Sequence, residues 1–187
     1  HIRHVPDGEF GDYVFDGLKE KTLLRIEGPL GSYFLREDSD RPIILIGGGT
    51  GFAPLKGMLE HAFHIGFNRS IHLFCGARAK RDLYMDDMVQ GWLQQHDNLK
   101  YTAVLSEPAE SDDWQGETGF VHESVIRHYP ELSGFDVYLS GPPPMVKAGM
   151  DLFYEKGLPE NQIFSDSFEY SDDALRAMGI QKPKTDA

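Results

Sequence analysis

The chain has 187 residues, enough for one ordinary domain or for one domain and a fragment of another. Hydrophobic residues make up 40% and charged residues 26%, a composition that can bury a core. With 18 Lys and Arg against 30 Asp and Glu, the net charge is −12, which argues against nucleic acid and anionic membranes as main partners. No apolar run approaches the roughly 20 residues of a membrane-spanning helix, and we see no secretory signal.

A single cysteine, Cys75, limits the cofactor chemistry of the chain. One thiol forms no internal disulfide, no cysteine zinc site and no cysteine-ligated iron–sulfur cluster within the chain. It is compatible with a reducing, cytoplasmic location, which we therefore expect. His61 and His64 can share a helix face, but no carboxylate stands at a useful spacing, so we expect no metal site.

The first 38 residues predict the end of a β-structure whose beginning is missing. They start with an extended pattern, a turn and a short amphipathic helix, over residues 1–5, 6–8 and 10–18. Two segments, 23–26 and 33–35, are then predicted as strands around a Gly-Pro turn. These few strands make no complete domain, so we expect an incomplete domain over 1–38.

The polar stretch Arg36–Arg41 is the predicted domain boundary, because strands and helices alternate after it. Such alternation predicts an α/β fold, a five-stranded doubly wound parallel sheet with helices on both faces. This domain is expected over 39–170, followed by a polar tail over 171–187. The predicted strands are 43–46, 70–75, 99–105, 135–139 and 162–168, and the predicted helices are 54–65, 82–96, 121–128 and 142–156.

A glycine-rich loop, Gly47-Gly48-Gly49-Thr50-Gly51-Phe52-Ala53-Pro54, follows the first of these strands. Consecutive glycines let backbone N–H groups approach a pyrophosphate, and the N-terminus of the next helix offers a positive dipole. The spacing differs from the dinucleotide fingerprint, since Pro54 stands at its third glycine position, and no Lys–Ser/Thr pair completes a Walker-type loop. A plain turn is the alternative, but four glycines within 47–51 favour a nucleotide site.

A second turn, Ser140-Gly141-Pro142-Pro143-Pro144-Met145, follows the strand at 135–139. Its prolines make it stiff, and a rigid helix start alone explains it equally well. In a sheet of strand order 3-2-1-4-5, however, the winding reverses between strands 1 and 4, and ligands bind at that point. Because the two loops follow those two strands, we expect them to meet in one nucleotide-binding crevice.

Two further segments are candidates at the same sheet edge. Gly76-Ala77-Arg78 follows the second strand, where NAD-selective folds place an acidic residue. Arg78 either contacts a phosphate of the nucleotide or is a solvated loop side chain, and the spacing leaves NAD against NADP open. At the end of the last strand an aromatic ring can cover a planar ligand. Core packing is the alternative there, and we favour it more for Phe164 than for Phe168.

Taken in order, five motifs resemble the ferredoxin–NADP reductase superfamily, namely GPLGSYFL, RPIILIGGGTGFAPLKGML, GARAKRDLYM, YLSGPPPMV and FSDSF. The stretch from HIRHVPDGEF to LRIEGPLGSYFLRE is most similar to CDP-6-deoxy-3,4-glucoseen reductase-like proteins, with 2Fe–2S flavoprotein oxygenase reductase components as near neighbours. The resemblance runs to about Tyr170. It implies a ferredoxin reductase-like NAD-binding domain after the C-terminal remnant of an FAD-binding β-barrel.

The resemblance also implies roles on the nicotinamide side. The residues that would bound the pyrophosphate of NADH or NADPH are Gly48, Gly49, Thr50 and Gly51, and those near the adenosine ribose are Ala77 and Arg78. The nicotinamide pocket would be lined by Ser140, Gly141, Pro142, Pro143 and Met145. Thr50 and Ser140 would orient the ring for hydride transfer and Phe168 would shield the flavin, which makes these three the implied catalytic residues.

On the flavin side, the implied FAD contacts are Ile2, Arg3, Gly8, Phe10 and Gly11, with Ile2 and Arg3 on a strand. Two departures are that Ser140 stands where many relatives have Cys, and Gly11 where the FAD loop usually has Ser. The Arg-x-Tyr-Ser motif that grips FAD would precede residue 1, and with a single cysteine we expect no ferredoxin-like module within these residues. We therefore expect FAD binding to be weakened or lost, with any 2Fe–2S cluster in another domain or protein.

The implied function is a flavoprotein reductase component. It would pass a hydride from NAD(P)H, with NADH favoured on resemblance alone, to FAD and then single electrons to an iron–sulfur domain or protein. No protein general base is expected, because hydride transfer needs none and the cofactors carry the chemistry. Two alternatives stay open: a nicotinamide-nucleotide-binding module without activity of its own, and a diffusible-flavin reductase, which SGPPPM disfavours.

Overall fold

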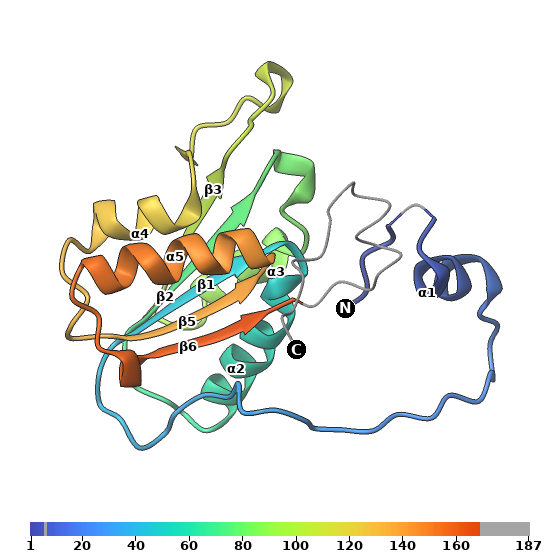
Figure 1. Ribbon diagram of the computed structural model, residues 1–187, viewed down its shortest axis with the longest axis horizontal. Helices are drawn as coiled ribbons and strands as arrows, with labels where there is room; N and C mark the ends of the chain where they lie inside the picture. The colour runs from blue at the N-terminus through green and yellow to red at the C-terminus, as the bar shows by residue number, and fades with distance from the viewer. Residues whose placement is uncertain (6, 169–187) are drawn as a thin grey trace, which may run out of the picture. The chain divides into compact units, whose positions relative to one another are not determined.

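A computed structural model describes residues 1–5 and 7–168 (Figure 1). The chain divides into two compact units between Ser32 and Tyr33. The second unit, Tyr33–Phe168, is called the α/β body below. The sequence-based boundary near residue 38 remains a proposal, and the predicted tail at 171–187 lies outside the described residues.

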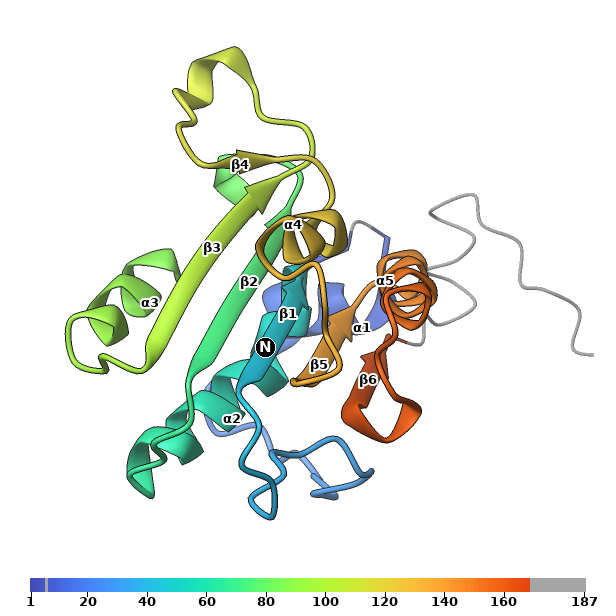
Figure 2. The ribbon, with the colours of Figure 1, turned by 90° about the vertical axis from the view of Figure 1, so that its left-hand side faces the viewer.

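The α/β body is built on a parallel sheet of six strands in the order β4-β3-β2-β1-β5-β6 (Figure 2). The strands are β1 (Ile43–Gly48), β2 (Ile71–Ala77), β3 (Leu99–Leu105), β4 (Glu117–Thr118), β5 (Asp136–Gly141) and β6 (Ile163–Ser167). The five predicted strands and their order are confirmed. The acidic stretch after β3, where no strand is predicted, contributes the short edge strand β4.

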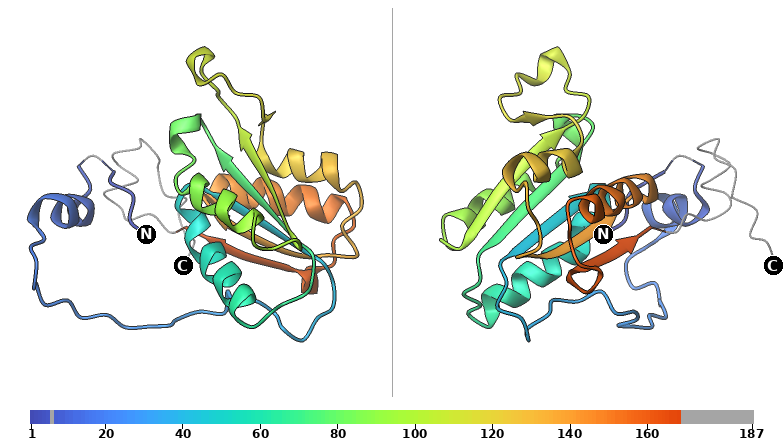
Figure 3. Two further views of the ribbon diagram at one scale, coloured as in Figure 1. Left: turned by 180° about the vertical axis from the view of Figure 1, so that it is seen from behind. Right: turned by 60° about the vertical axis from the view of Figure 1, so that its left-hand side comes forward.

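Helices cover both faces of this sheet, as the alternating pattern predicts. One face carries α2 (Phe52–His64) and α3 (Asp86–Leu93), seen in front of the sheet in the left panel of Figure 3. The other face carries α4 (Val121–His128) and α5 (Pro143–Glu155), which lie in front of the sheet in Figure 1. Two apolar cores result, because the buried strands β1 and β5 send alternate side chains to either face. Among the described helices, none has the length and apolar character needed to cross a membrane.

The helix predicted over 82–96 is shorter in the structure and begins at Asp86. Residues Lys80–Asp82 form a separate 3-10 turn, in which the Asp82 carboxylate accepts a hydrogen bond from the Ala79 N–H at 3.3 Å. Met85 then adopts a left-handed backbone with φ of 64°, which breaks the helical path. The helical spacing was present in the sequence, but a local side-chain cap competes with it.

The unit before Tyr33 has one helical segment, formed by α1 (Glu9–Asp12) and a π-helical turn at Tyr13–Gly17, where the sequence predicts a helix. The strands predicted at 1–5, including Ile2 and Arg3, at 23–26 and at 33–35 are absent from the described residues, and those predictions are wrong. A strand requires a neighbour for its backbone hydrogen bonds, and no described segment pairs with these three. Leu23 and Ile26 are 98% and 87% exposed as a result.

Candidate functional site

The glycine loop connects β1 to α2 at the carboxyl edge of the sheet. Gly49–Gly51 forms a 3-10 turn, and Gly49 has φ of +55°, a conformation that favours glycine. A Cβ on Gly51 would lie 2.1 Å from the carbonyl oxygen of Ser140. The loop after β1 and the loop after β5 are therefore in direct backbone contact, and the predicted meeting of the two motifs is confirmed.

The second loop is fitted to the first by its own glycine. Gly47 is in register with Ser140 across the β1–β5 pair, and Gly141 has φ of +149°. A Cβ on Gly141 would lie 3.0 Å from Gly48 O, and one on Gly48 would lie 2.5 Å from Met145 Sδ. Pro143 starts α5 at a position where a missing N–H costs nothing. The contacts leave no space for side chains, so this edge presents mainly backbone groups.

Ser140 carries a polar atom that the fold leaves unused. Its side chain is fully buried, and its Oγ has no hydrogen-bond partner within the described part of the chain. A buried hydroxyl without a partner is uncommon because its desolvation goes uncompensated. An orphaned donor and acceptor beside the contact of the two loops fits a ligand that approaches there.

A small hollow lies on the β2 side of the glycine loop. Its walls come from the first loop, the ends of β2 and β3 and the segment before α3, namely Gly47, Gly49, Phe52, Cys75, Gly76, Asp82, Leu83, Tyr84, Val89 and Tyr101. Tyr84 stands edge-on to Phe52, with ring centroids 6.0 Å apart. Sequence reasoning missed Tyr84 as a lining residue, although it lies in the quoted motif GARAKRDLYM, and noted Asp82 only as the acidic residue four positions after Arg78. Ala77 is half-buried and Arg78 is exposed just after β2.

The thiol in this hollow is Cys75. Burial raises the pKa of Cys75 to about 12, which keeps the thiol protonated at neutral pH. The adjacent Tyr101 hydroxyl donates to Asp86 Oδ1 at 2.7 Å. The chemistry of this edge therefore rests on binding and not on a thiolate.

The two aromatic residues of the last strand have different surroundings. Phe164 stacks on the buried Tyr138 with ring centroids 4.8 Å apart. It packs against the apolar core between the sheet and α2, as predicted. Phe168 follows β6, is half-buried, and its N–H donates to Gly141 O at 3.1 Å. That bond brings Phe168 to the edge that holds Ser140 and Gly141. Its role in shielding a flavin stays a prediction.

The residues predicted to contact FAD lie in the unit before Tyr33. Only their contacts within that unit are described. A Cβ on Gly8 would lie 2.9 Å from Val5 O, so this tight turn requires glycine. Gly11 packs near the His4 ring, while Ile2, Arg3 and Phe10 are exposed. The turn and helix start expected for a flavin loop are present, but the strand expected at Ile2 and Arg3 is not.

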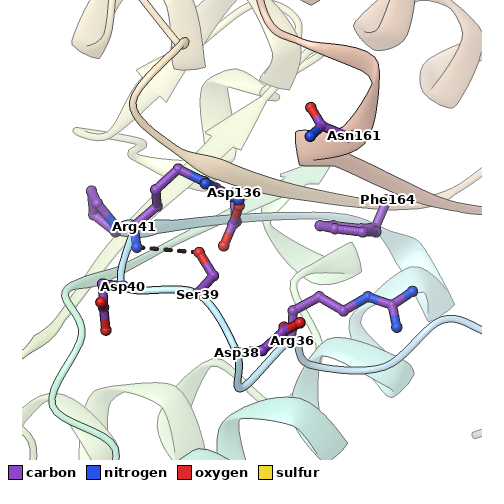
Figure 4. Close-up of a pocket in the computed structure, with 9 residues that line it drawn as sticks. Arg36, Asp38, Ser39, Asp40, Arg41, Asp136, Asn161 and Phe164 are labelled. Atoms are coloured by element: carbon purple, nitrogen blue, oxygen red, sulfur yellow. Dashed lines mark hydrogen bonds and ion pairs between the residues drawn. The ribbon is translucent and has the colours of Figure 1, made fainter.

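A wide hollow of about 850 Å³ lies at the opposite, amino edge of the sheet (Figure 4). It is lined by residues 36–42 except Glu37, together with Asp136, Asn161 and Phe164. The Asp136 carboxylate, although it faces the hollow, is fully paired with Arg41 and Arg69. Neither predicted nucleotide motif reaches this edge, so we place the candidate site at the carboxyl edge.

Known proteins of similar sequence are longer than this chain. The chain is 42% identical to protein RfbI of Salmonella typhimurium over 91% of its length and 51% of that protein's. It is 42% identical to the CDP-6-deoxy-L-threo-D-glycero-4-hexulose-3-dehydrase reductase of Yersinia pestis, over 90% of this chain and 50% of the relative. The anthranilate 1,2-dioxygenase electron transfer component of Acinetobacter baylyi is 33% identical, over 92% and 50%. The chain thus spans about half the length of these curated relatives.

Two solved reductase structures also match the chain over about half of their own length. The Amycolatopsis cytochrome P450 reductase GcoB matches with a TM-score of 0.74 and 31% identity, over 89% of this chain and 50% of that one. The ferredoxin reductase in carbazole 1,9a-dioxygenase matches with a TM-score of 0.73 and 31% identity, over 90% and 50%. The family model described as the oxidoreductase NAD-binding domain matches residues 45–150, which include both loops of the carboxyl edge. The chain belongs to this oxidoreductase NAD-binding domain family, of the ferredoxin–NADP reductase type.

Proposed function

We propose that the chain is the nicotinamide-nucleotide-binding part of a flavoprotein reductase, in which a hydride passes from NAD(P)H to FAD and electrons pass on to an iron–sulfur acceptor. The observation that carries this proposal is the backbone contact of the two carboxyl-edge loops at Gly51 and Ser140. Nucleotides bind at the switch point of such sheets, and β1 and β5 flank that point here.

The residues present fit a dinucleotide. The close-packed backbone of Gly48–Gly51 and the N-terminus of the 13-residue α2 favour a pyrophosphate. Thr50 and the orphaned Ser140 hydroxyl would orient the nicotinamide, beside Gly141, Pro142, Pro143 and Met145. Bound NAD(P)H supplies the hydride, and FAD accepts it. The protein's part is positioning, with reacting atoms held within about 3–3.5 Å.

NADH is the favoured nucleotide in this proposal. The Asp82 carboxylate lines the hollow that follows β2, on the side where Ala77 and Arg78 would face the adenosine ribose. A carboxylate accepts hydrogen bonds from ribose hydroxyls and repels a 2′-phosphate. The exposed Arg78 would act in the opposite sense, and its solvation weakens its attraction.

The proposal also covers the electron acceptor and the cellular location of the protein. The names of the anthranilate and carbazole relatives describe electron transfer within oxygenase systems, which supports a protein partner that takes electrons. Any 2Fe–2S centre of this chain's system would lie in that partner or in another domain, since one cysteine ligates no such cluster. A cytoplasmic location agrees with a single free thiol.

The test is a visible absorption spectrum of the purified chain after FAD is added and the excess is removed, followed by NADH. A retained flavin band that NADH bleaches is the expected result for a working hydride-transfer unit. If no flavin is retained while calorimetry shows NADH binding, the chain is a nucleotide-binding module and the reductase activity belongs to a longer protein. Turnover with free flavin alone would instead indicate a diffusible-flavin reductase.

The module without activity has one observation in its favour. The described residues before β1 form no strand, so the FAD contacts expected at Ile2 and Arg3 lack their strand. NADH binding without flavin retention is the outcome that would select this alternative.

Gly49→Val tests the phosphate cradle directly. Gly49 has φ of +55°, and valine both disfavours that backbone and adds bulk where the pyrophosphate would lie, so NADH affinity should fall at least about tenfold. Gly66→Val is the matched control, because Gly66 has φ of +69°, open space around it and a place after α2, away from the loops. Equal NADH affinities, measured by calorimetry, would refute the cradle.

A further inference from the structure

The segment Tyr33–Arg41, called the strap below, is held on the α/β body by side-chain contacts and not by sheet pairing. Leu35 is buried in the apolar core between the sheet and α2. The Tyr33 ring stands edge-on to the buried Tyr138, with centroids 6.1 Å apart. Tyr138 and Phe164 lie on the face of the sheet that carries α2, since α5 covers the opposite face. The strap therefore adds to the cover that α2 gives to this face of the sheet.

Arg36 lies at the centre of the strap and is fixed through its backbone and its side chain. Its N–H donates to Tyr138 Oη at 2.8 Å. Its guanidinium lies 3.9 Å from the ring centroid of Phe34 and 4.9 Å from that of Phe164. The polar sequence REDSDR is typical of a solvated linker, but its first residue is anchored to both Tyr138 and Phe164.

Arg69 binds both ends of the polar part of the strap. Its Nη1 donates to Arg36 O at 2.8 Å, and its Nε donates to Arg41 O. Its Nη2 donates to Asp136 Oδ2 at 2.5 Å. Only 9% of the Arg69 side chain is exposed. A planar guanidinium offers donors in a fixed fork, which a lysine does not, so this geometry requires arginine.

Asp136 completes the arrangement at the first residue of β5. Its side chain has no exposed surface, and its Oδ1 accepts from Arg41 Nε at 2.7 Å. Its N–H donates to Pro42 O at 3.0 Å. Buried ion pairs add little net stability, because desolvation offsets their attraction, and their best-attested use is to fix one arrangement. Here the arrangement that they fix is the path of the strap.

We propose that Arg69 and Asp136 are positioning residues that make the strap a rigid part of the α/β body. In contrast, residues 28–31, which precede the strap, are exposed and lie in no helix or strand. Two of them are glycines, and Gly31 has φ of +85° with open space around it. The polar stretch 36–41 thus moves with the sheet and is not a flexible linker. This inference does not depend on the proposed function.

Limited trypsin digestion of the whole chain tests the inference, with the rate at each bond compared with that in a peptide of residues 25–42. In the wild-type chain, trypsin should cut freely after Arg25, which lies in the exposed stretch, while the Arg36–Glu37 bond stays protected. Arg69→Gln should speed cleavage at Arg36–Glu37 at least about tenfold without changing the rate after Arg25, because proteolysis follows the population of the opened segment. Arg69→Lys should do the same, since charge without the fork is insufficient.

Arg127→Gln is the matched control. Arg127 also binds a carboxylate and a carbonyl, at Glu117 Oε2 and Thr118 O, but on α4 and away from the strap. Its removal should leave the Arg36–Glu37 bond protected. Protection at this bond that survives Arg69→Gln, or wild-type cleavage as fast as in the peptide, would overturn the proposal.

If Arg69→Gln does not fold, Tyr138→Phe provides an independent test, because it keeps the ring and removes only the hydroxyl that accepts from Arg36 N–H. Hydrogen exchange at the Arg36 amide should accelerate about tenfold, while exchange within β1 stays unchanged. A wild-type Arg36 amide that exchanges as fast as that of Arg25 would show that the strap is not docked.

Discussion

The two edges of the sheet are held together by different kinds of contact. At the carboxyl edge, the loops of Gly48–Gly51 and Ser140–Gly141 meet backbone to backbone, and a single Cβ would separate them. At the amino edge, the closing contacts come from long charged side chains, with Asp136 held between Arg41 and Arg69. The first edge gains room for a ligand by having few side chains, and the second gains rigidity by using many donors on one carboxylate.

From this difference we infer that the carboxyl edge serves ligand binding and that the amino edge serves rigidity. Backbone amides that no side chain covers suit an anionic ligand, and the unpartnered Ser140 Oγ lies at that edge. The donors of Arg69 at the other edge are already used within the body. A substitution at the carboxyl edge should therefore mainly change affinity for nucleotide, and one at the amino edge should mainly change stability.

The largest effect is expected from Asp136→Ala at the amino edge. Removing the carboxylate leaves the buried Arg69 without its counter-charge, which costs about 3–5 kcal/mol of unfolding free energy. Urea unfolding would measure this loss. Asp151→Ala is the control, because Asp151 is 60% exposed and pairs with Lys147 one helical turn away, a contact worth at most about 0.5 kcal/mol. Similar losses for both variants would contradict the assigned difference.

Gly51→Ala is expected to act next most strongly, and on binding. Its φ of −59° suits alanine, so the cost comes from the Cβ that would lie 2.1 Å from Ser140 O. Moving the two loops apart costs about 1–3 kcal/mol, and NADH affinity should fall about 10- to 100-fold. Gly57→Ala in α2, the helix that follows Gly51, has open space around it and should leave affinity unchanged. Calorimetry on both variants separates crowding at the loop from a change in helix propensity.

A pH dependence is expected from His72, which lies between the two edges on β2. Burial, with smaller contributions from the positive charges of His128 and Lys100, lowers the pKa of His72 to about 4. The unfolded chain takes up this proton near pH 6.5, so it binds more protons than the folded chain between pH 6.5 and 4. Stability should therefore fall as the pH drops through that window, by at most about 1.4 kcal/mol per pH unit.

His72→Gln isolates this contribution. Glutamine retains hydrogen-bonding groups for Tyr129 Oη and Thr102 Oγ1, which lie 2.8 and 2.9 Å from the two imidazole nitrogens, but it does not titrate. The slope of stability against pH between 4 and 6.5 should become shallower in this variant. Because His128 and Glu117 are paired nearby, they are left unchanged in both proteins.

The sequence predicts the α/β body well because its signals are local. The apolar run of β1 and the helical spacing of α4 do not depend on distant partners, and Val121–His128 was predicted with its observed limits. The meeting of the two loops was also predictable, since chain order and the right-handed crossover rule place them at one switch point. At the site, the sequence therefore predicted which loops lie together.

The failures share a cause, which is dependence on a partner elsewhere in the chain. Glu117–Thr118 becomes a strand only because Val104 and Leu105 offer free backbone groups. Residues 33–35 have the apolar pattern of a strand, but Tyr33 and Leu35 pack by their side chains instead. Arg69 and Asp136 are 67 residues apart, and no spacing rule brings them together. Such contacts become evident only in three dimensions.

The smallest effect is expected from Arg78→Ala, and it addresses the choice of nucleotide at the carboxyl edge. Arg78 is exposed, so its attraction for a 2′-phosphate is screened by water and salt. The variant should lose less than about tenfold in NADPH affinity and leave NADH affinity unchanged, with the difference shrinking as salt rises. Arg81→Ala is the control, since Arg81 is also exposed but lies in the turn at Lys80–Asp82 and not directly after β2. Equal losses for NADH and NADPH in Arg78→Ala would show that this arginine contacts a feature common to both nucleotides, and Asp82 would then remain as the candidate for discrimination.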